Sequence, residues 1–477
     1  MKYETVIGLE IHAELATNTK IYCSCENKFG GDENTRCCPV CIGLPGVLPV
    51  LNKKVVDYGI KAGLAMNCDI SRYCKQDRKN YFYPDLPKAF QISQFDLPLC
   101  KEGYVEIETE AGIKKIGITR IHIEEDAGKL MHAEDGDYSR VDYNRGGVPL
   151  IEIVSEPDMR SPEEALAFLE AVKSILQCVG VSDCKMQEGS LRCDINLSLR
   201  PEGQKEFGVR SECKNVNSFR AAVRAMQYEQ KRQAEILDAG GEVEQETRRW
   251  DDLKGQSFTL RSKEEAHDYR YFPEPDLMPL VIDEEWIEKI RASLPELPRE
   301  KKQRYIDSLG LPEYDATMIS GSRGLADLLE ESVSKGAPAK LAANWIMGDI
   351  SKILNEKMMD ATDIPFSGEA LAQLVALIEK GTISGTIAKQ VLPCMFEEDK
   401  SPEEIVKEKG LMQISDEGEI IKMIQEVFDA NPQAIADYKA GKKQAMGFLT
   451  GQIMRASKGK ANPGVIQKKL QEMLRAL

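Results

Sequence analysis

The sequence predicts an α+β fold for residues 1–292, followed by an all-helical domain over residues 293–404 and a helical tail domain over residues 405–477. In the first region, short runs of alternating apolar and polar residues are separated by Gly, Pro and Asn/Asp turns, which is typical of strands. These runs outnumber the helical segments and are close enough for antiparallel pairing, so we expect a largely antiparallel sheet. Prolines become dense over residues 273–298, and a helical period follows them.

Two helices interrupt the strands of the first region. One begins at the capping box SPEE, residues 161–164, and ends near Gly180. The other runs over about residues 218–239 and stops at a pair of glycines. A second break, DKSP at residues 399–402, precedes the tail. A chain of 477 residues agrees with this division, because domains average roughly 150 residues.

The charge of the chain is unevenly distributed. A net charge of −15 argues against a protein that coats nucleic acid without specificity. Residues 439–477, however, hold nine Lys/Arg against one acidic residue, Glu472, a local balance of +8. This pattern indicates contact with a polyanion the size of a tRNA, or else a solvated basic helix surface. Apolar runs are too short for a bilayer and the N-terminus lacks signal features, so we expect a cytoplasmic protein without membrane contact.

Five of the thirteen cysteines lie within residues 23–41. Cys23-x-Cys25, twelve residues, then Cys38-x-x-Cys41 is a spacing that lets four thiolates surround Zn²⁺. Four cysteine ligands leave no open position, so such a zinc would be structural. Cys37, next to Cys38, leaves the identity of one ligand open, and buried free thiols are the alternative interpretation.

Several predicted strands carry charged residues on one face. Acids brought together there would repel one another unless a cation lay among them. Mg²⁺ prefers oxygen ligands and brings phosphates with it, while a histidine among the acids leaves Mn²⁺ open. A solvated outer face is the other interpretation. The members of this face that carry the hypothesis are Glu10, His12, Glu124, Glu152, Arg192, Asp194, Asn196 and Lys214, with Glu125 at a strand end.

A nucleotide at this face would bind without a phosphate loop. The chain contains neither G-x-x-x-x-G-K-[ST] nor G-x-G-x-x-G. The remaining arrangement is an open sheet that holds Mg-ATP through metal ions, as in ligases that phosphorylate carboxylates. Residues 77–95 add Lys79, Tyr81 and Lys88, which suit phosphate contact and stacking on a base. A buried aromatic loop with solvated basic residues would give the same pattern.

Long motifs along the whole chain resemble a known family. "VIGLEIHAEL", "CPVCIGLPGVLPVLN", "DRKNYFYPDLPKAFQISQF", "HIEEDAGK", "PLIEIVSEPD", "GSLRCDINLS" and "DYRYFPEPDLMPL" are similar to the B subunits of bacterial aspartyl/glutamyl-tRNA amidotransferases. The resemblance implies a glutamine-synthetase-like N-terminal domain and a tail that binds tRNA. It also implies ATP-dependent phosphorylation of the side-chain carboxylate of Glu on tRNA(Gln) or Asp on tRNA(Asn), followed by amidation with ammonia. Such an enzyme is a carbon–nitrogen ligase with glutamine as amido-nitrogen donor (EC 6.3.5.-).

The resemblance also assigns residues and partners. His12, Glu125 and Glu152 are then the expected Mg²⁺ ligands, with His12 and Glu125 nearest the ion. Ammonia would come from a glutaminase (amidase), the A subunit, and a small C subunit would complete a heterotrimer. The implied catalytic set is Glu10, His12, Glu124, Glu125, Glu152 and Asp194; the implied ATP-binding set is Lys79, Tyr81, Lys88, Arg192, Asn196 and Lys214; and the implied zinc ligands are Cys23, Cys25, Cys38 and Cys41.

Two other functions fit parts of the pattern. A stand-alone ATP-dependent carboxylate–amine ligase would use the same acidic face but would need no basic tail. A non-enzymatic, zinc-stapled RNA-binding protein would use the cysteines and the tail and would tolerate loss of the acids. The sequence does not distinguish Glu-tRNA(Gln) from Asp-tRNA(Asn) as substrate.

Overall fold

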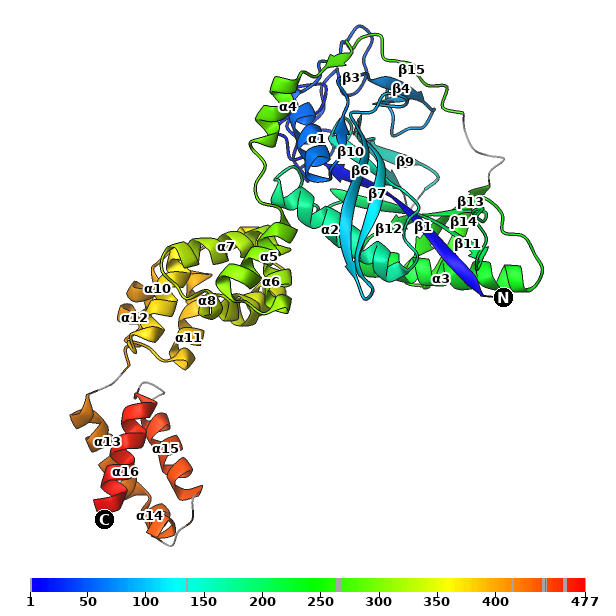
Figure 1. Cartoon of the computed structure of the whole chain (residues 1–477). Coiled ribbons are helices and arrows are strands. Elements are labelled where there is room, and N and C mark those ends of the chain that lie inside the picture. The colour runs from blue at the N-terminus through cyan, green and yellow to red at the C-terminus, as the bar shows by residue number, and fades with distance from the viewer. Residues whose placement is uncertain are drawn as a thin grey trace. The chain divides into compact units, whose positions relative to one another are not determined.

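The computed structural model describes residues 2–476 apart from 134–135, 263–267, 414–415, 440–441, 443 and 458–460. The chain divides into two compact units, Met1–Pro298 and Arg299–Leu477. Strands and helices alternate in the first unit, whereas the described residues of the second unit form only helices and the loops between them (Figure 1). The α+β fold class is therefore confirmed.

A nine-stranded sheet organises the first unit, in the order β14-β13-β12-β11-β1-β10-β7-β6-β2. Every neighbouring pair is antiparallel except β12 and β13, which are parallel. The prediction of a largely antiparallel sheet is thus correct. The strands are β1 (Tyr3–Glu14), β2 (Asp69–Ile70), β6 (Cys100–Thr109), β7 (Gly112–Glu125), β10 (Pro149–Ser155), β11 (Leu191–Pro201), β12 (Ser211–Val216), β13 (Glu246–Asp251) and β14 (Gln256–Ser262).

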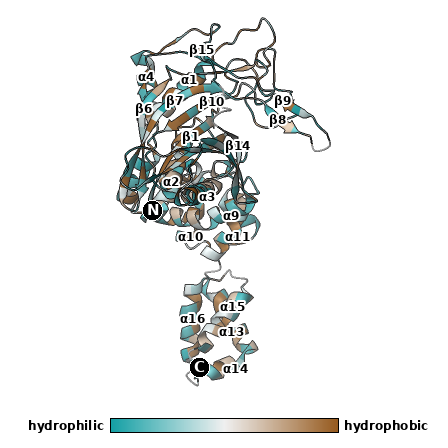
Figure 2. Ribbon diagram, turned by 90° about the vertical axis from the view of Figure 1, so that its right-hand side faces the viewer, coloured by the Kyte–Doolittle hydropathy of each residue, from teal (hydrophilic) through white to brown (hydrophobic). Residues whose placement is uncertain are grey.

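Three long helices cover one face of this sheet: α1 (Lys53–Ala65), α2 (Pro162–Cys178) and α3 (Phe219–Asp238). Their apolar residues share one core with Ile7, Leu9 and Ile11 of β1 and the matching residues of neighbouring strands. Figure 2 shows this hydrophobic concentration along the central strands. Since alternate strand residues point to opposite faces, the charged residues between these apolar ones lie on the uncovered face.

The sequence predicted α2 and α3 close to their observed bounds, but it did not predict α1. This helix carries Gly59 and Gly63, which disfavour a helical interpretation of the sequence. In the structure both glycines are required by packing. A Cβ atom on Gly59 would lie 2.5 Å from Leu99 Cδ2, and one on Gly63 would lie 2.5 Å from Cys100 Sγ. The glycines therefore let α1 approach the sheet.

Three small sheets lie outside the large one. β4 (Asp77–Asn80) pairs with β5 (Phe90–Ser93) and with β15 (Phe272–Pro273), which brings the end of the first unit beside the segment at residues 77–95. The other two sheets are β3 (Tyr73–Cys74) with β16 (Leu280–Val281), and β8 (Lys129–His132) with β9 (Ser139–Asp142). The short helix α4 (Glu284–Arg291) follows β16.

The second unit contains two separate hydrophobic cores. The predicted boundary between residues 404 and 405 falls inside α12, whose Ile405 and Val406 are buried in the first of these cores. No helix among the described residues is long and apolar enough to cross a membrane. The first core is built from α5 (Pro298–Leu309), α6 (Glu313–Ser320), α7 (Arg323–Ser334), α8 (Ala339–Trp345), a π-helical turn (Ile346–Ile350), α9 (Ser351–Lys357), a 3₁₀ turn (Ala361–Asp363), α10 (Gly368–Glu379), α11 (Gly385–Met395) and α12 (Pro402–Glu408).

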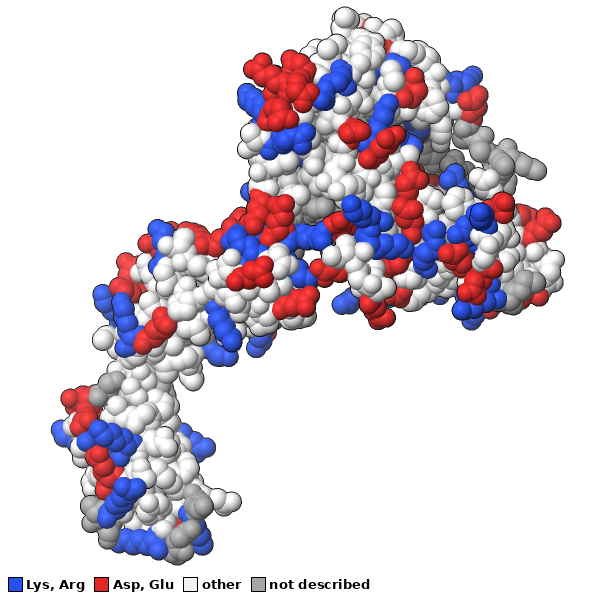
Figure 3. All heavy atoms as spheres, viewed as in Figure 1, with Lys and Arg blue, Asp and Glu red and all other residues white. Residues whose placement is uncertain are grey.

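The tail helices are α13 (Glu417–Ala430), α14 (Pro432–Lys439), α15 (Gln444–Ala456) and α16 (Pro463–Ala476). Acidic residues are common in α13, so the predicted excess of positive charge belongs to the helices that follow it. Figure 3 shows Lys and Arg at several places on the tail beside a strip of Asp and Glu. Of the nine basic residues that carried the prediction, Lys443, Lys458 and Lys460 lie outside the described residues.

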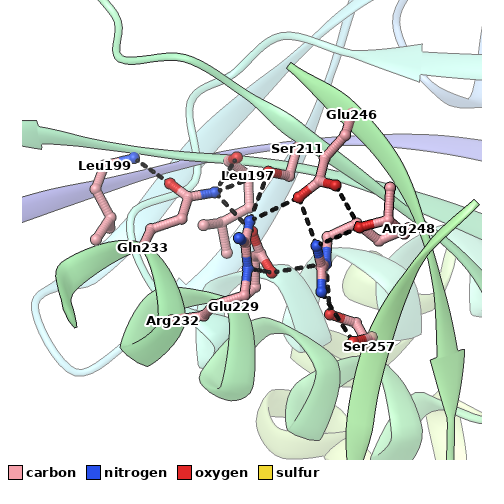
Figure 4. Close-up of polar contacts among 10 residues, drawn as sticks. Leu197, Leu199, Ser211, Glu229, Arg232, Gln233, Glu246, Arg248 and Ser257 are labelled. Atoms are coloured by element: carbon pink, nitrogen blue, oxygen red, sulfur yellow. Dashed lines mark hydrogen bonds and ion pairs between the residues drawn. The ribbon is translucent and has the colours of Figure 1, made fainter. Parts of the chain in front are cut away.

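A buried polar network fastens α3 to the outer strands of the sheet (Figure 4). Gln233 is fully buried; its Oε1 accepts from the Leu199 amide (3.1 Å) and its Nε2 donates to the Leu197 carbonyl (3.1 Å). The pairing of β11 with β12 ends at Leu197, so the Gln233 side chain continues the hydrogen bonding where β12 stops. Further out, Arg248 of β13 donates to Ser257 Oγ of β14 (2.7 Å).

Replacing Gln233 with Leu should destabilise the first unit by about 3 kcal/mol, because buried backbone groups of β11 lose their partners. Urea unfolding followed by tryptophan fluorescence in a Trp345→Phe background would measure this, since Trp250 and Trp286 then report only on the first unit. The control is Gln227→Leu on the exposed side of the same helix. Equal midpoints for the two variants would show that the network contributes no stability.

Candidate functional site

The antiparallel register brings the charged residues of separate strands together on the uncovered face. β1 lies between β11 and β10, so Glu10 is opposite Asp194 and His12 is opposite Glu152. On the other side of β10, Glu152 is opposite His122 of β7. Five of the predicted residues therefore meet in one place: Glu10, His12, Glu124, Glu152 and Asp194.

Two histidines lie among these acids. The Nε2 atom of His12 is 3.3 Å from a Glu152 oxygen and 3.5 Å from a Glu124 oxygen. A Glu10 oxygen is 3.8 Å from the same nitrogen. His122 contacts Glu124 at 3.4 Å and Glu152 at 3.5 Å through its own Nε2. Its buried Nδ1 has no hydrogen-bond partner among the described residues. Strand alternation puts His122 on the charged face, but its position between two carboxylates was not predicted.

The pKa values of the cluster show how its charges balance. Burial disfavours a charged His122, but the carboxylates of Glu152 and Glu124 outweigh burial and raise its pKa to about 9. Burial likewise opposes ionisation of Glu152, yet the two histidines hold its pKa well below the usual range. Glu10 differs, because burial and the charge of Glu152 together raise its pKa. The cluster is thus short of positive charge beside Glu10.

Two overlapping groups have the composition of a metal site. Glu10, His12 and Asp194 form one, and His12, Glu124 and Glu152 form the other. In each group one ligand atom per residue lies within 4.8 Å of the others. Carboxylate oxygens with one imidazole nitrogen suit Mg²⁺ or Mn²⁺. A divalent cation would also supply the positive charge that Glu10 lacks.

Basic residues border the acidic cluster. Lys214 Nζ of β12 donates to Asp194 Oδ2 (2.5 Å) and lies 3.0 Å from Glu212. Burial opposes a charged Lys79, but Glu124 and nearby groups outweigh it and raise the pKa of Lys79. Arg192, opposite His12 in the register, donates to Asp126 Oδ2 (2.8 Å). The predicted Asn196 lies further along β11, opposite Gly8.

Aromatic rings surround Lys79. Its Nζ lies 4.9 Å from the ring centre of Tyr269, and Tyr81 meets the same ring edge to face at 5.9 Å. Tyr271 continues the group at 6.1 Å from Tyr269 and stacks on Phe95 at 4.3 Å. Tyr269 and Tyr271 were not predicted as site residues. The signal that would have found them is their alternation directly before β15, which pairs with β4.

Glu125 and Lys88 lie apart from this cluster. Both Glu125 carboxylate oxygens accept from Lys88 Nζ, at 2.5 and 2.6 Å, and one also accepts from the Ile92 amide (2.9 Å). Because successive strand residues point to opposite faces, Glu125 is directed away from Glu124. Glu125 and Lys88 instead line a cavity of about 170 Å³ together with Tyr22 and Cys41. No metal-like group among the described residues contains Glu125.

The four predicted cysteines form a second metal-like group. The sulfurs of Cys23, Cys25, Cys38 and Cys41 all lie within 4.8 Å of one another. Cys41 Sγ is 4.0 Å from Cys25 Sγ and 3.9 Å from Cys38 Sγ. Sulfurs bound tetrahedrally at about 2.3 Å from zinc would be roughly 3.8 Å apart, so the arrangement fits that ion. Cys37 turns away and donates to the Asn34 carbonyl (3.1 Å), which removes it from the set.

Comparisons with known proteins agree over nearly the whole chain. Residues 5–288 match the model of the GatB/GatE catalytic domain, and residues 327–474 match that of the GatB domain. The chain is 60% identical over 477 residues to the B subunit of the aspartyl/glutamyl-tRNA(Asn/Gln) amidotransferase of Caldicellulosiruptor bescii, with 99% of each chain covered. It is 57% identical over 479 residues to the protein of the same name from Carboxydothermus hydrogenoformans, with 100% of each chain covered. The corresponding protein of Clostridium botulinum is 56% identical over 473 residues, 99% of each chain.

Proposed function

The chain belongs to the GatB/GatE family, and we propose that it is the B subunit of a glutamine-dependent, tRNA-dependent amidotransferase. Relatives that match it from end to end carry that name. The reaction is ATP-dependent phosphorylation of the side-chain carboxylate of Glu on tRNA(Gln), Asp on tRNA(Asn), or both, followed by displacement of phosphate by ammonia. The enzyme class is a carbon–nitrogen ligase with glutamine as amide donor.

The convergence of four carboxylates around His12 on an open sheet carries this proposal. A carboxylate resists attack by ammonia because its charge repels a nucleophile and it has no leaving group. Phosphorylation removes both obstacles. Mg²⁺ held by Glu10, His12, Glu124, Glu152 and Asp194 would neutralise the charge on the phosphates of ATP.

The residues around the acids have separate roles in this proposal. Lys79 and Lys214 lie beside the cluster with their charges directed to it, so they suit the outer phosphate oxygens. The rings of Tyr81, Tyr269 and Tyr271 offer a surface on which the adenine of ATP or of the tRNA terminus can stack. Arg192 and Asn196 line the same face from β11. For Glu125 to bind Mg²⁺, as the family resemblance implies, its contact with Lys88 would first have to break.

The four-cysteine group is proposed to hold a structural Zn²⁺. The loop from residue 18 to residue 50 contains little regular structure, and several of its apolar residues are exposed, including Leu44, Leu48 and Val50. Such a loop buries too little apolar surface to order itself. A metal that joins its two ends supplies the missing stability.

Partners complete the proposal. The A subunit, a glutaminase (amidase), would supply ammonia, and a small C subunit would join the two in a heterotrimer, while the tail helices α14–α16 would bind the tRNA body. A cytoplasmic location follows from a substrate that is an aminoacyl-tRNA. A stand-alone carboxylate–amine ligase is the rival function, and it would release phosphate with a free amino acid and no tRNA.

We expect Glu152→Gln and Asp194→Asn each to reduce tRNA-dependent phosphate release by about a hundredfold or more, because each removes a charge that faces the cation. The assay combines the chain with its partner subunits, ATP, glutamine and misacylated tRNA. Glu110→Gln, in an exposed turn, is the control. Affinity for tRNA should stay within a few fold in all three variants. Normal phosphate release in the Glu152 and Asp194 variants would instead support a non-enzymatic protein.

Neutralising three exposed basic residues of the tail together, Lys439→Ala, Arg455→Ala and Lys468→Ala, should weaken tRNA binding and flatten its dependence on salt. The slope of log K against log salt should fall by about 2 to 3, because each phosphate contact contributes roughly 0.9. Filter binding of labelled tRNA at several salt concentrations would measure this. The triple change Lys340→Ala, Lys380→Ala and Lys407→Ala, outside the tail helices, is matched in charge and should leave the slope unchanged. Equal slopes for both triples would contradict binding by the tail.

Elemental mass spectrometry should find about one zinc per chain. Cys38→Ser should lose that zinc, whereas Cys37→Ser should keep it, because only the Cys38 sulfur belongs to the four-cysteine group. The adjacent positions and identical chemical change make the two variants a matched pair. Loss of zinc from both, or from neither, would show that the ligand set is wrong.

A further inference from the structure

Lys20 is a fully buried lysine beside the four-cysteine group. It follows β1, and its backbone amide donates to the carbonyl of Cys25 at 3.0 Å, which places it in the cysteine loop. Its side chain runs inward, and its Nζ ends 3.9 Å from Cys41 Sγ. A lysine with no exposed surface is unusual in a protein and requires a partner for its charge.

The contacts of Lys20 leave that charge without a carboxylate. Nζ donates to the carbonyl of Gly146 at 2.6 Å and to that of Tyr143 at 3.2 Å. Among the described residues, no carboxylate forms an ion pair with it. An ammonium has three donors, and two of them are used by these carbonyls. The third is available to Cys41, so the nearest source of negative charge is the cysteine group.

Four thiolates around Zn²⁺ carry a net charge of −2, since four negative charges exceed the two positive ones. A buried centre of that charge needs compensation as much as a buried ammonium does. We propose that Lys20 is the counter-charge of the four-cysteine metal centre and that it positions the turn at residues 143–147 against that centre. This inference rests on the proposal that the cysteines hold zinc.

The turn links the metal centre to the edge of the acidic face. The Gly147 amide donates to the carbonyl of Asp126 (2.9 Å), and the Ile21 amide donates to that of Gly147 (3.0 Å). Arg145 Nε donates to the Ala127 carbonyl (3.0 Å). Asp126 in turn accepts from Arg192, the residue opposite His12. Lys20 is therefore a positioning residue: it touches no substrate, but it ties the zinc loop to the turn that holds Asp126.

A purely structural role for Lys20 would be donation to the two carbonyls, without any effect on the metal. Lys20→Gln keeps a donor and removes the charge, while Lys20→Met keeps the length and removes both. Lys20→Arg keeps the charge. Lys28→Met is the matched control, because Lys28 lies in the same loop but is exposed.

Zinc affinity of the full chain, measured by competition with a chromophoric chelator, separates these roles. We expect both neutral variants, Lys20→Met and Lys20→Gln, to bind zinc about tenfold to a hundredfold more weakly, which is the usual cost of losing a group that supports metal ligands. Lys28→Met should bind as the unaltered chain does. Lys20→Arg should restore most of the affinity if its larger head is accommodated. The thiolate-to-metal charge-transfer bands of the Co²⁺-substituted protein should persist in the neutral variants, which shows that the four ligands remain in place.

Unchanged zinc affinity in folded Lys20→Met and Lys20→Gln would overturn the proposal. So would a loss in Lys20→Met alone, because Gln would then replace Lys as a neutral donor. If a variant fails to fold, the far-ultraviolet circular dichroism of the remaining variants decides which comparison is valid, and the Gln and Arg pair still isolates the charge. An unaltered chain that holds no zinc would instead refute the zinc site itself, which keeps the two proposals distinguishable.

Discussion

Repulsion among buried carboxylates governs the organisation of the first unit. Glu10, Glu124, Glu152 and Asp194 come from four strands, and none could be brought so close to the others without nearby positive charge. The protein supplies part of that charge through His12, His122 and Lys214. The raised pKa of Glu10 marks the place where this supply is incomplete. A site that remains short of one cation is suited to bind a metal together with a polyphosphate.

The covered face of the sheet keeps these charges in register. A shift of one residue in β1 would turn Ile7, Leu9 and Ile11 out of the core and the acids into it, which strongly favours the observed pairing. α1 and α3 reinforce it in different ways. The glycines of α1 allow close packing on β6 and the segment before it, while Gln233 of α3 completes the hydrogen bonding of β11. The same forces that form the core therefore assemble the site.

Two peripheral segments complete the acidic face, and each is fastened by a charged residue in an unusual place. Arg78 of β4 makes two hydrogen bonds with the buried carboxylate of Glu274, at 2.7 and 2.9 Å, which fixes the end of the first unit beside residues 77–95 and brings Tyr269 and Tyr271 to Lys79. Lys20 holds the cysteine loop against the turn at residues 143–147. In both cases a few strong polar contacts replace the hydrophobic burial that these irregular segments lack.

Features that depend on short-range order could be predicted from the chain alone: the alternation of Glu10 and His12 with apolar residues, the capping box of α2, and the paired spacing of the cysteines. Such patterns extend over a few residues, and the backbone geometry of a strand or a helix turns them directly into faces. Which faces meet became known only from the folded arrangement. It placed His12 opposite Glu152, separated Glu125 from its neighbour Glu124, removed Cys37 from the metal set, and brought Tyr269 to Lys79 from 190 positions away along the chain. These outcomes depend on strand register and on packing between distant segments, and no local pattern in the sequence encodes either one.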